Sequence, residues 1–166
     1  MSEIEQKIKK ISLFALDFDG VFTDNRVFID EKGKETVVCD RSDSLGLKML
    51  REKRPDVTVI VISKETSRVV RARCDKLNIT CRTGIDDKLT TFREIIAEKE
   101  LNPARVAYMG NDVNDLECIT FAGIGVAVAD SDPKVLAIAD YITRKNGGRG
   151  AIREFIDIIL SETTTY

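Results

Sequence analysis

The sequence contains no histidine and no tryptophan. The absence of histidine excludes a Ser-His-Asp or Cys-His catalytic group and any metal site built on imidazole ligands. Acid–base chemistry in this chain must therefore come from carboxylates, lysine or tyrosine. The four cysteines form no CxxC pair. We therefore expect no zinc site and interpret the cysteines as small buried thiols in a reducing compartment.

Long apolar runs are also missing. No stretch approaches the roughly 20 apolar residues that a membrane-spanning helix needs, and the first ten residues lack the apolar core of a signal peptide. A net charge of −2 gives no basic excess of the kind that favours nucleic acid. We therefore expect a cytoplasmic protein that binds neither membranes nor nucleic acid, with residues 1–166 forming one domain whose core spans about residues 11–160.

The sequence does contain a regular alternation of strand-like and helix-like segments. Apolar runs at residues 11–16, 57–62, 105–109 and 124–128 are typical of buried parallel strands. Segments with helical spacing of apolar residues lie between them, and we expect Asp43 to cap the first of these. The alternation predicts an α/β fold with a doubly wound parallel sheet. Two short β-rich runs around Gly33 predict a β-hairpin flap after the first strand.

Polar residues follow three of the predicted strands. Asp17 and Asp19 follow the first strand, Ser63 follows the second, and Asn111, Asp112 and Asp115 come after residues 105–109. Because the carboxyl ends of parallel strands meet at one edge of a sheet, we expect these side chains to lie close together. Two neighbouring carboxylates repel each other unless a cation or a proton separates them, which favours a bound Mg²⁺.

Lys88, at the start of a predicted helix, could reach the same edge. Several acids, one hydroxyl and one ammonium together suit phosphoryl transfer. A metal and an ammonium offset the phosphate charge, a hydroxyl donates to a phosphate oxygen, and a carboxylate attacks phosphorus.

Four segments, taken in order, resemble the motifs of the haloacid dehalogenase-like phosphatases. They are DFDGVFTD at residues 17–24, Ser63, Lys88 and GNDVND at residues 110–115. The resemblance can be narrowed to one subgroup of this family. The sequence has no room for a cap domain, a predicted hairpin follows the first motif, and residues 42–46 and 147–154 resemble segments of that subgroup. It contains the 3-deoxy-D-manno-octulosonate 8-phosphate phosphatases and the C-terminal domains of CMP-sialic acid synthetases. The resemblance implies a homotetrameric, Mg²⁺-dependent phosphatase acting on an eight- or nine-carbon 2-keto-3-deoxy sugar acid phosphate.

The resemblance also implies a role for each catalytic candidate. Asp17 would be the nucleophile that forms an aspartyl-phosphate, and Asp19 would be the general acid and base. Ser63 would bind the transferring phosphoryl group, although a serine here is also typical of a helix cap. Lys88 would offset phosphate charge and hold Asp17, the alternative being a solvated lysine at a helix start.

The predicted metal site departs from the usual pattern of the subgroup. Asp17 and Asp19 would be ligands, but Asn111 stands where the subgroup usually has an aspartate. An amide oxygen can bind Mg²⁺ but brings no charge. Either Asn111 binds the metal, or Asp112 replaces it. The departure leaves an alternative function open, a non-catalytic tetramerisation module. A phospho-acceptor domain resembling a response regulator is a third possibility that leaves the hairpin unexplained.

The resemblance implies a set of substrate contacts as well. They comprise Asp19, Lys88, Asp40, Arg41, Ser42, Asp43, Ser44, Lys48, Arg73 and Arg149. Residues 40–44 read Asp-Arg-Ser-Asp-Ser where the octulosonate enzymes usually have Asn-Val-Arg-Asp-Gly, which favours a nine-carbon, sialic-acid-type substrate. Lys48 and Arg73 are equally typical of a solvated helix face. Arg149 could reach a neighbour's site, or it could belong to a plain turn before a helix.

Overall fold

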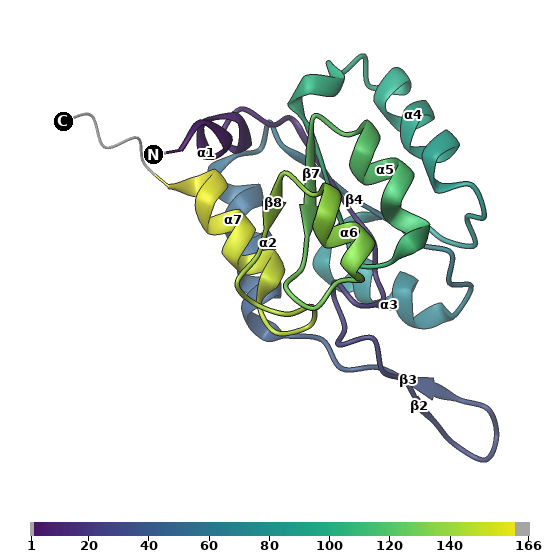
Figure 1. Ribbon diagram of the computed structural model, residues 1–166. Coiled ribbons are helices and arrows are strands. Elements are labelled where there is room, and N and C mark those ends of the chain that lie inside the picture. Colours follow the sequence, from purple (N-terminus) through teal and green to yellow (C-terminus); the bar gives the residue numbers. More distant parts are fainter. Residues whose placement is uncertain (1, 162–166) are drawn as a thin grey trace.

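A six-stranded parallel sheet forms the centre of the protein (Figure 1). The structure, a computed structural model, describes residues 2–161. The strand order is β5-β4-β1-β6-β7-β8. The strands are β1 (Leu13–Leu16), β4 (Thr58–Ile62), β5 (Thr80–Arg82), β6 (Val106–Gly110), β7 (Ile124–Ala127) and β8 (Tyr141–Ile142). The chain moves outward from β1 to β4 and β5, then crosses back to β6, so the order reverses between β1 and β6. Open α/β sheets bind ligands beside such a reversal, at the carboxyl ends of the strands.

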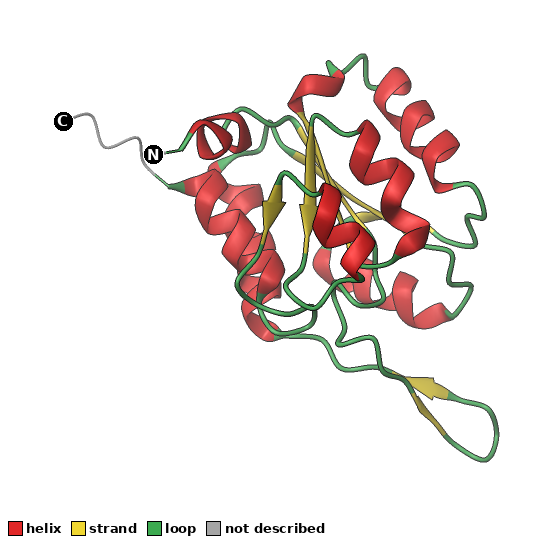
Figure 2. Ribbon diagram, viewed as in Figure 1, coloured by secondary structure: helices red, strands yellow, loops and turns green. Residues whose placement is uncertain are grey.

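Helices cover both faces of the sheet, as Figure 2 shows in red and yellow. One face packs on α1 (Glu3–Ile8), α2 (Arg41–Lys53), α3 (Arg68–Leu77) and α7 (Ala151–Leu160). The other packs on α4 (Lys88–Glu98), α5 (Leu116–Phe121) and α6 (Pro133–Ile138). Phe14 and Leu16 of β1 face the first layer, whereas Leu13 and Ala15 face the second. All four are buried because both faces are covered, which confirms the predicted doubly wound α/β fold.

The register of the central strands brings their carboxyl ends together. Leu16 of β1 lies beside Val61 of β4 and Met109 of β6. The next residue, Asp17, donates its backbone N–H to the carbonyl of Met109 at 2.9 Å. The polar residues after β1, β4 and β6 therefore start from neighbouring points on one edge of the sheet.

The predicted hairpin is present and projects away from the body of the protein (Figure 1). Its strands, β2 (Phe28–Ile29) and β3 (Glu35–Thr36), are antiparallel and shorter than the β-rich runs suggested. An isolated bridge between Thr23 and Cys39 closes its base. The large apolar side chains of Phe28 and Ile29 are 65% and 64% exposed. The hairpin thus has an apolar surface that no described part of this chain covers.

Three local expectations differ from the structure. Asp40, and not Asp43, caps α2, because the Asp40 carboxylate accepts from the backbone N–H of Ser42. The helix α1 was not expected, and Ser2 caps it. The apolar spacing after Asp86 and Asp87 predicts a helix to about residue 101, but α4 ends at Glu98, because the chain turns at Glu100 with a positive φ of 52°. Two short 3₁₀ turns, η1 (Pro103–Arg105) and η2 (Val113–Asp115), flank β6. No helix within residues 2–161 has the length and apolar character to cross a membrane.

Candidate active site

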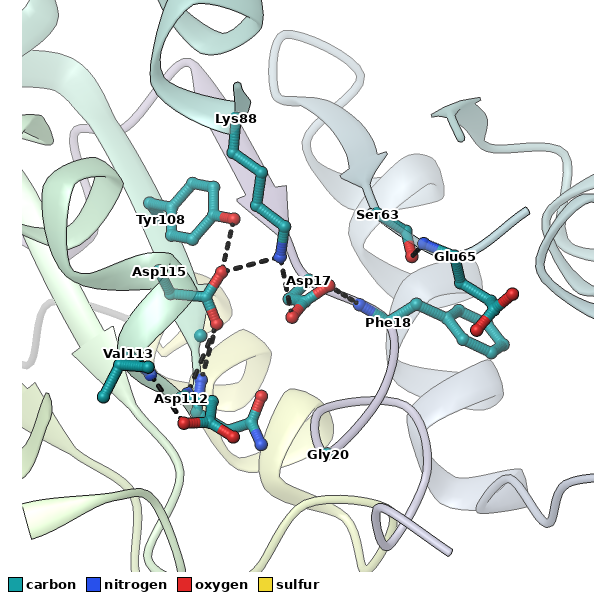
Figure 3. A network of polar contacts seen from close by, with 12 residues as sticks. Asp17, Phe18, Gly20, Ser63, Glu65, Lys88, Tyr108, Asp112, Val113 and Asp115 are labelled. Carbon is teal, nitrogen blue, oxygen red and sulfur yellow. Dashed lines mark hydrogen bonds and ion pairs between the residues drawn. The ribbon is translucent and has the colours of Figure 1, made fainter. Parts of the chain in front are cut away.

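A buried ion cluster lies at the carboxyl edge of β1 and β6 (Figure 3). Lys88, the first residue of α4, extends its ammonium to within 2.8 Å of both Asp17 Oδ2 and Asp115 Oδ1. All three residues are buried. Burial acts to lower the pKa of Lys88, but its two carboxylate partners outweigh this and raise it. Burial raises the pKa of Asp17, the charge of Asp115 raises it further, and Lys88 opposes both. A buried charge is tolerated only when it is paired, so Lys88 fixes the geometry of both acids.

Asp115 is completely buried and is held from three sides. Besides the ammonium of Lys88, its carboxylate accepts from the Tyr108 hydroxyl at 2.9 Å and from the backbone N–H of Asn111 at 3.0 Å. A Cβ atom added to Gly110 would lie 2.5 Å from the Asp115 side chain, so the close approach requires glycine. Asp115 therefore links the ion cluster to the loop after β6.

Asp19 lies two residues beyond Asp17 and is only half-buried. It lines a pocket of about 130 Å³ together with Arg26, Glu35 and Glu65. Burial raises the pKa of Asp19, and the charges of Glu65 and Glu35 raise it further against the opposing charge of Lys88. A carboxyl group with a raised pKa holds its proton to higher pH, which suits a general acid.

Ser63 follows β4 and is buried. Its hydroxyl oxygen accepts from the backbone N–H of Glu65 at 3.1 Å, which leaves the hydroxyl hydrogen available as a donor. The residue that caps α3 is Ser67, whose side chain accepts from the N–H of Val69. Ser63 is therefore not that helix cap, and it stands beside the loop that carries the other polar residues.

The amide of Asn111 fits a metal site. Asn111 follows β6 and is 7% exposed, and its Oδ1 is buried with no hydrogen-bond partner among the described residues. An unpaired buried acceptor costs about 1–3 kcal/mol, which a cation bound to it offsets. Asp112 is exposed, and its Oδ1 accepts from the Val113 N–H at 2.7 Å. The geometry therefore favours Asn111 over Asp112 as the donor from this loop.

The side chains of Asp17, Asp19 and Asn111, which we call the metal corner, determine which cation this site suits. Within residues 2–161 no three side chains of His, Cys, Asp or Glu are grouped so that they could hold a metal. A metal here would need the amide of Asn111 beside the carboxylates of Asp17 and Asp19. Such a set contains only oxygen, and oxygen ligands suit a hard cation such as Mg²⁺.

Comparison with known proteins identifies the family. The model of the haloacid dehalogenase-like hydrolases matches residues 65–156. A 3-deoxy-D-manno-octulosonate 8-phosphate phosphatase of Yersinia pestis is 35% identical over 95% of this chain and 84% of its own. The chain belongs to the haloacid dehalogenase-like hydrolases. The corresponding phosphatase of Escherichia coli K12 is 34% identical over 96% of this chain and 84% of its own.

Solved structures of haloacid dehalogenase-like hydrolases also resemble this chain. The octulosonate phosphatase of Moraxella catarrhalis, in complex with magnesium, phosphate and KDO, is 36% identical with a TM-score of 0.91. The match covers 96% of this chain and 91% of that one. A hydrolase of the same family from Streptomyces avermitilis is 42% identical with a TM-score of 0.88, over 92% of this chain and 87% of that one. No cap domain is present in the described residues, in agreement with the sequence.

The residues predicted for the reaction lie together in this haloacid dehalogenase-like fold, and one of their partners was missed. Asp17 and Lys88 are in contact, and Ser63 and Asn111 follow β4 and β6, the two strands that flank β1. Asp115, the last acid of the GNDVND motif, was expected at this edge of the sheet but without a role, and the structure places it in contact with Lys88. Tyr108 gave no signal, because a tyrosine within an apolar strand is indistinguishable from a core residue.

The predicted substrate contacts around the start of α2 form one network. The Asp40 carboxylate accepts from both the N–H and the hydroxyl of Ser42, each at 2.6 Å. Ser44 donates to the Asp40 carbonyl at 3.2 Å and accepts from the guanidinium of Arg73. Arg41 is exposed beside them. Arg73 is thus tied to the segment and is not a free solvated side chain.

Three other predicted contacts have different surroundings. Asp43 is buried and accepts from the backbone N–H of Arg153 in α7 at 2.8 Å, so its carboxylate is directed at a helix end and not at an open site. Burial raises the pKa of Asp43 to about 6. Lys48 is exposed and lies 3.8 Å from Glu52 on its own helix. Arg149 is exposed and lies 3.4 Å from Asp24 in the loop after β1.

Proposed function

We propose that this protein is a Mg²⁺-dependent phosphatase that hydrolyses the phosphate monoester of a 2-keto-3-deoxy sugar acid through an aspartyl-phosphate at Asp17. The observation that carries the proposal is the buried contact between Asp17 and Lys88, with the half-buried Asp19 beside it. The named octulosonate phosphatases, about one third identical over most of both chains, support the reaction class.

The proposed reaction proceeds in two chemical steps. In the first, an Asp17 oxygen attacks phosphorus, the bond from phosphorus to the sugar oxygen breaks, and Asp19 gives its proton to that oxygen. In the second, ionised Asp19 takes a proton from water as the water oxygen attacks phosphorus, which releases phosphate and restores Asp17. Lys88 and Ser63 offset and orient the phosphoryl oxygens. Mg²⁺ held by Asp17, Asp19 and Asn111 would supply further positive charge to the phosphoryl group.

Within this substrate class we propose a nine-carbon, sialic-acid-type compound as the preferred substrate. The segment 40–44, with its two serines and Arg73 attached, differs from the sequence usual in octulosonate enzymes. The guanidinium of Arg73 is a suitable partner for a sugar carboxylate. The acids Glu35 and Glu65 in the pocket of Asp19 are suitable acceptors for hydroxyl or amide donors of the sugar.

The experiment is a screen of eight- and nine-carbon 2-keto-3-deoxy sugar acid phosphates, with phosphate release measured in the presence of Mg²⁺. We expect the nine-carbon compounds to have the higher kcat/KM. The Asp17→Asn variant provides the background rate. Equal, low rates for all sugar acids would contradict the substrate class while leaving the phosphatase chemistry intact, provided that p-nitrophenyl phosphate is still hydrolysed.

A second candidate function is a non-catalytic tetramerisation module. Asn111 in place of the usual aspartate favours it, because the predicted metal site has lost one charge. The exposed apolar hairpin is expected in both cases, and we propose that it joins subunits into a homotetramer. Absence of p-nitrophenyl phosphate hydrolysis with Mg²⁺, Mn²⁺ and Co²⁺ would favour this candidate over the phosphatase.

A further inference from the structure

The amino terminus of α7 lacks a cap from its own segment. Gly150 occupies the cap position with φ of +94° and offers no side chain. The carboxylate of Asp43, in the first turn of α2, accepts from the backbone N–H of Arg153, the third residue of α7, at 2.8 Å. A capping side chain usually accepts from the second or third N–H of its helix, and a negative charge is favourable there. Asp43 therefore caps α7 from a different helix.

The two helices pack closely at this point. A Cβ atom added to Gly46 would lie 2.8 Å from the Arg153 side chain and 3.3 Å from its Cα. Gly46 follows Asp43 by three residues and lies on the same face of α2. The short carboxylate of Asp43 can reach α7 only because this glycine allows the close approach. The position of the first turn of α7 is thus set by α2.

The segment immediately before α7 lies directly on the loop after β1. The backbone N–H of Gly148 donates to the Val21 carbonyl at 2.9 Å. A Cβ atom added to Gly147 would collide with the carbonyl oxygen of Gly20. The two backbones are therefore in contact, and a shift of α7 at its amino end would move the loop that carries Asp19 and Gly20.

Gly20 in turn lies against the amide of Asn111. A Cβ atom added to Gly20 would collide with Asn111 Nδ2 and would lie 2.9 Å from Oδ1. The orientation of that amide, whose oxygen has no partner among the described residues, depends on where Gly20 stands. Contacts thus run without interruption from Asp43 through α7 and its preceding glycines to Asn111.

We propose that Asp43 is a positioning residue for the metal corner: by capping α7 it holds the Gly147–Gly148 backbone against Gly20 and so fixes the amide of Asn111. The proposal rests on the metal site of the proposed function. Asp130 holds the middle of the same loop through the Gly147 N–H at 2.9 Å, and Glu154 holds its start at residues 144 and 145. Asp43 secures the remaining end, where the loop becomes helix.

The test measures Mn²⁺ binding by electron paramagnetic resonance in the full chain. Loss of a group hydrogen-bonded directly to a metal ligand commonly raises the Kd about 10- to 100-fold. Asp43 acts on Asn111 through α7 and the glycines before it, so Asp43→Ala is expected to raise the Kd by no more than the lower end of this range, about tenfold. Asp43→Asn keeps an acceptor oxygen but forms a weaker, neutral hydrogen bond, so its Kd is expected between those of Asp43→Ala and the wild type. The control is Asp157→Ala, which removes a carboxylate 2.7 Å from the side chain of the same Arg153 and should leave the Kd unchanged.

Two results would overturn the proposal. One is a folded Asp43→Ala variant, by circular dichroism, that binds Mn²⁺ like the wild type even if it unfolds at lower temperature. The other is an equal loss in Asp157→Ala, which would indicate general loosening of α7. If Asp43→Ala does not fold, Asp43→Asn decides, and wild-type affinity in that variant contradicts the proposal. Because binding needs no turnover, a wild-type protein that binds Mn²⁺ without hydrolysing phosphate esters would contradict only the proposed function.

Discussion

Asp17 and Asp19 are the same residue type two positions apart, yet their surroundings differ. Asp17 is buried in contact with an ammonium, whereas Asp19 is half-buried at the edge of a pocket with two other acids. Burial raises the pKa of both carboxyl groups, so the distinction lies in their contacts. The ammonium of Lys88 holds Asp17 in place for attack, whereas Asp19, at the edge of the pocket, can exchange a proton with a bound substrate or water. The different environments are the physical basis for assigning them different roles.

Substitution of each aspartate by asparagine should therefore have a different effect. Asp17→Asn is expected to abolish hydrolysis and to form no acyl-phosphate. Asp19→Asn is expected to lower turnover of sugar acid phosphates about 10²- to 10⁴-fold, the usual range for a general acid–base. With p-nitrophenyl phosphate, whose leaving group needs no proton, Asp19→Asn should accumulate the aspartyl-phosphate, measured by acid quench with radiolabelled substrate. Equal behaviour of the two variants would contradict the separate roles.

The raised pKa of Asp19 also predicts a pH dependence. Asp19 must be protonated to release a sugar alkoxide, and burial together with Glu65 and Glu35 raises its pKa above the usual value. The kcat/KM for a sugar acid phosphate should therefore fall as pH rises through this raised pKa. Glu65→Gln removes one of the charges that raise the pKa of Asp19. In this variant kcat/KM should therefore begin to fall at a lower pH than in the wild type.

The hydroxyl of Tyr108 is expected to contribute more to stability than that of Tyr141. Tyr108 donates to the fully buried Asp115 at 2.9 Å, whereas Tyr141 donates to the partly exposed Glu154 at 3.1 Å. Tyr108→Phe should lower the free energy of unfolding by about 2 kcal/mol, since hydrogen bonds to charged groups contribute about 1.5–3 kcal/mol. Tyr141→Phe is the control and should have a smaller effect. Urea unfolding of both variants measures the difference, and equal losses would contradict the expected role of burial.

At the scale of single residues, the sequence predicted where the candidate reacting and ligating residues lie in the fold better than it predicted the groups that support them. Asp17, Ser63, Lys88 and Asn111 follow strand ends or open a helix, and such positions can be recognised in the sequence. Asp43 was misassigned because the sequence shows which helix an acid precedes, but not that a distant helix begins with glycine and needs a cap. That need arises only when α2 and α7 pack together.

At the scale of elements, the hairpin is the part least supported by the rest of the chain. An isolated two-stranded hairpin is at best marginally stable in water, and β2 and β3 pair over only two residues each. The apolar side chains of Phe28 and Ile29 are nevertheless exposed. The sequence predicted this hairpin from its β-rich runs and Gly33, but it did not predict that only two residues of each strand would pair.

The hairpin should therefore determine the oligomeric state. If the proposed homotetramer forms through the hairpin, the double variant Phe28→Ser with Ile29→Ser should sediment as smaller species than the wild type, measured by sedimentation velocity at several concentrations. Ile142→Ser is the control, because Ile142 is a similarly apolar residue, 44% exposed, on the edge strand β8. An unchanged sedimentation coefficient in the double variant would contradict assembly through the hairpin.

At the scale of the whole molecule, the alternation of segments predicted the doubly wound sheet but not the order of its strands. That order follows from which apolar faces pack best, and each buried strand of this chain is apolar on both faces. Its consequence is functional. Asp17 and Asp19 come from the loop after β1 and Asn111 from the loop after β6, so the proposed metal corner joins the two halves of the sheet where the order reverses.

A cation bound across this reversal should stabilise the entire fold. Ligand at 100 times its Kd adds about 2.7 kcal/mol to a fold that binds it only when native, which for a chain of this size raises the Tm by roughly 5–10 °C. We expect Mg²⁺ to raise the Tm of the wild type and to leave that of Asn111→Ala nearly unchanged. Asn111→Asp should show a larger rise at the same Mg²⁺ concentration, because a third carboxylate increases affinity for a divalent cation. Calorimetry with and without EDTA measures the shifts, and an equal rise in all three proteins would show that Mg²⁺ acts elsewhere, without the amide of Asn111.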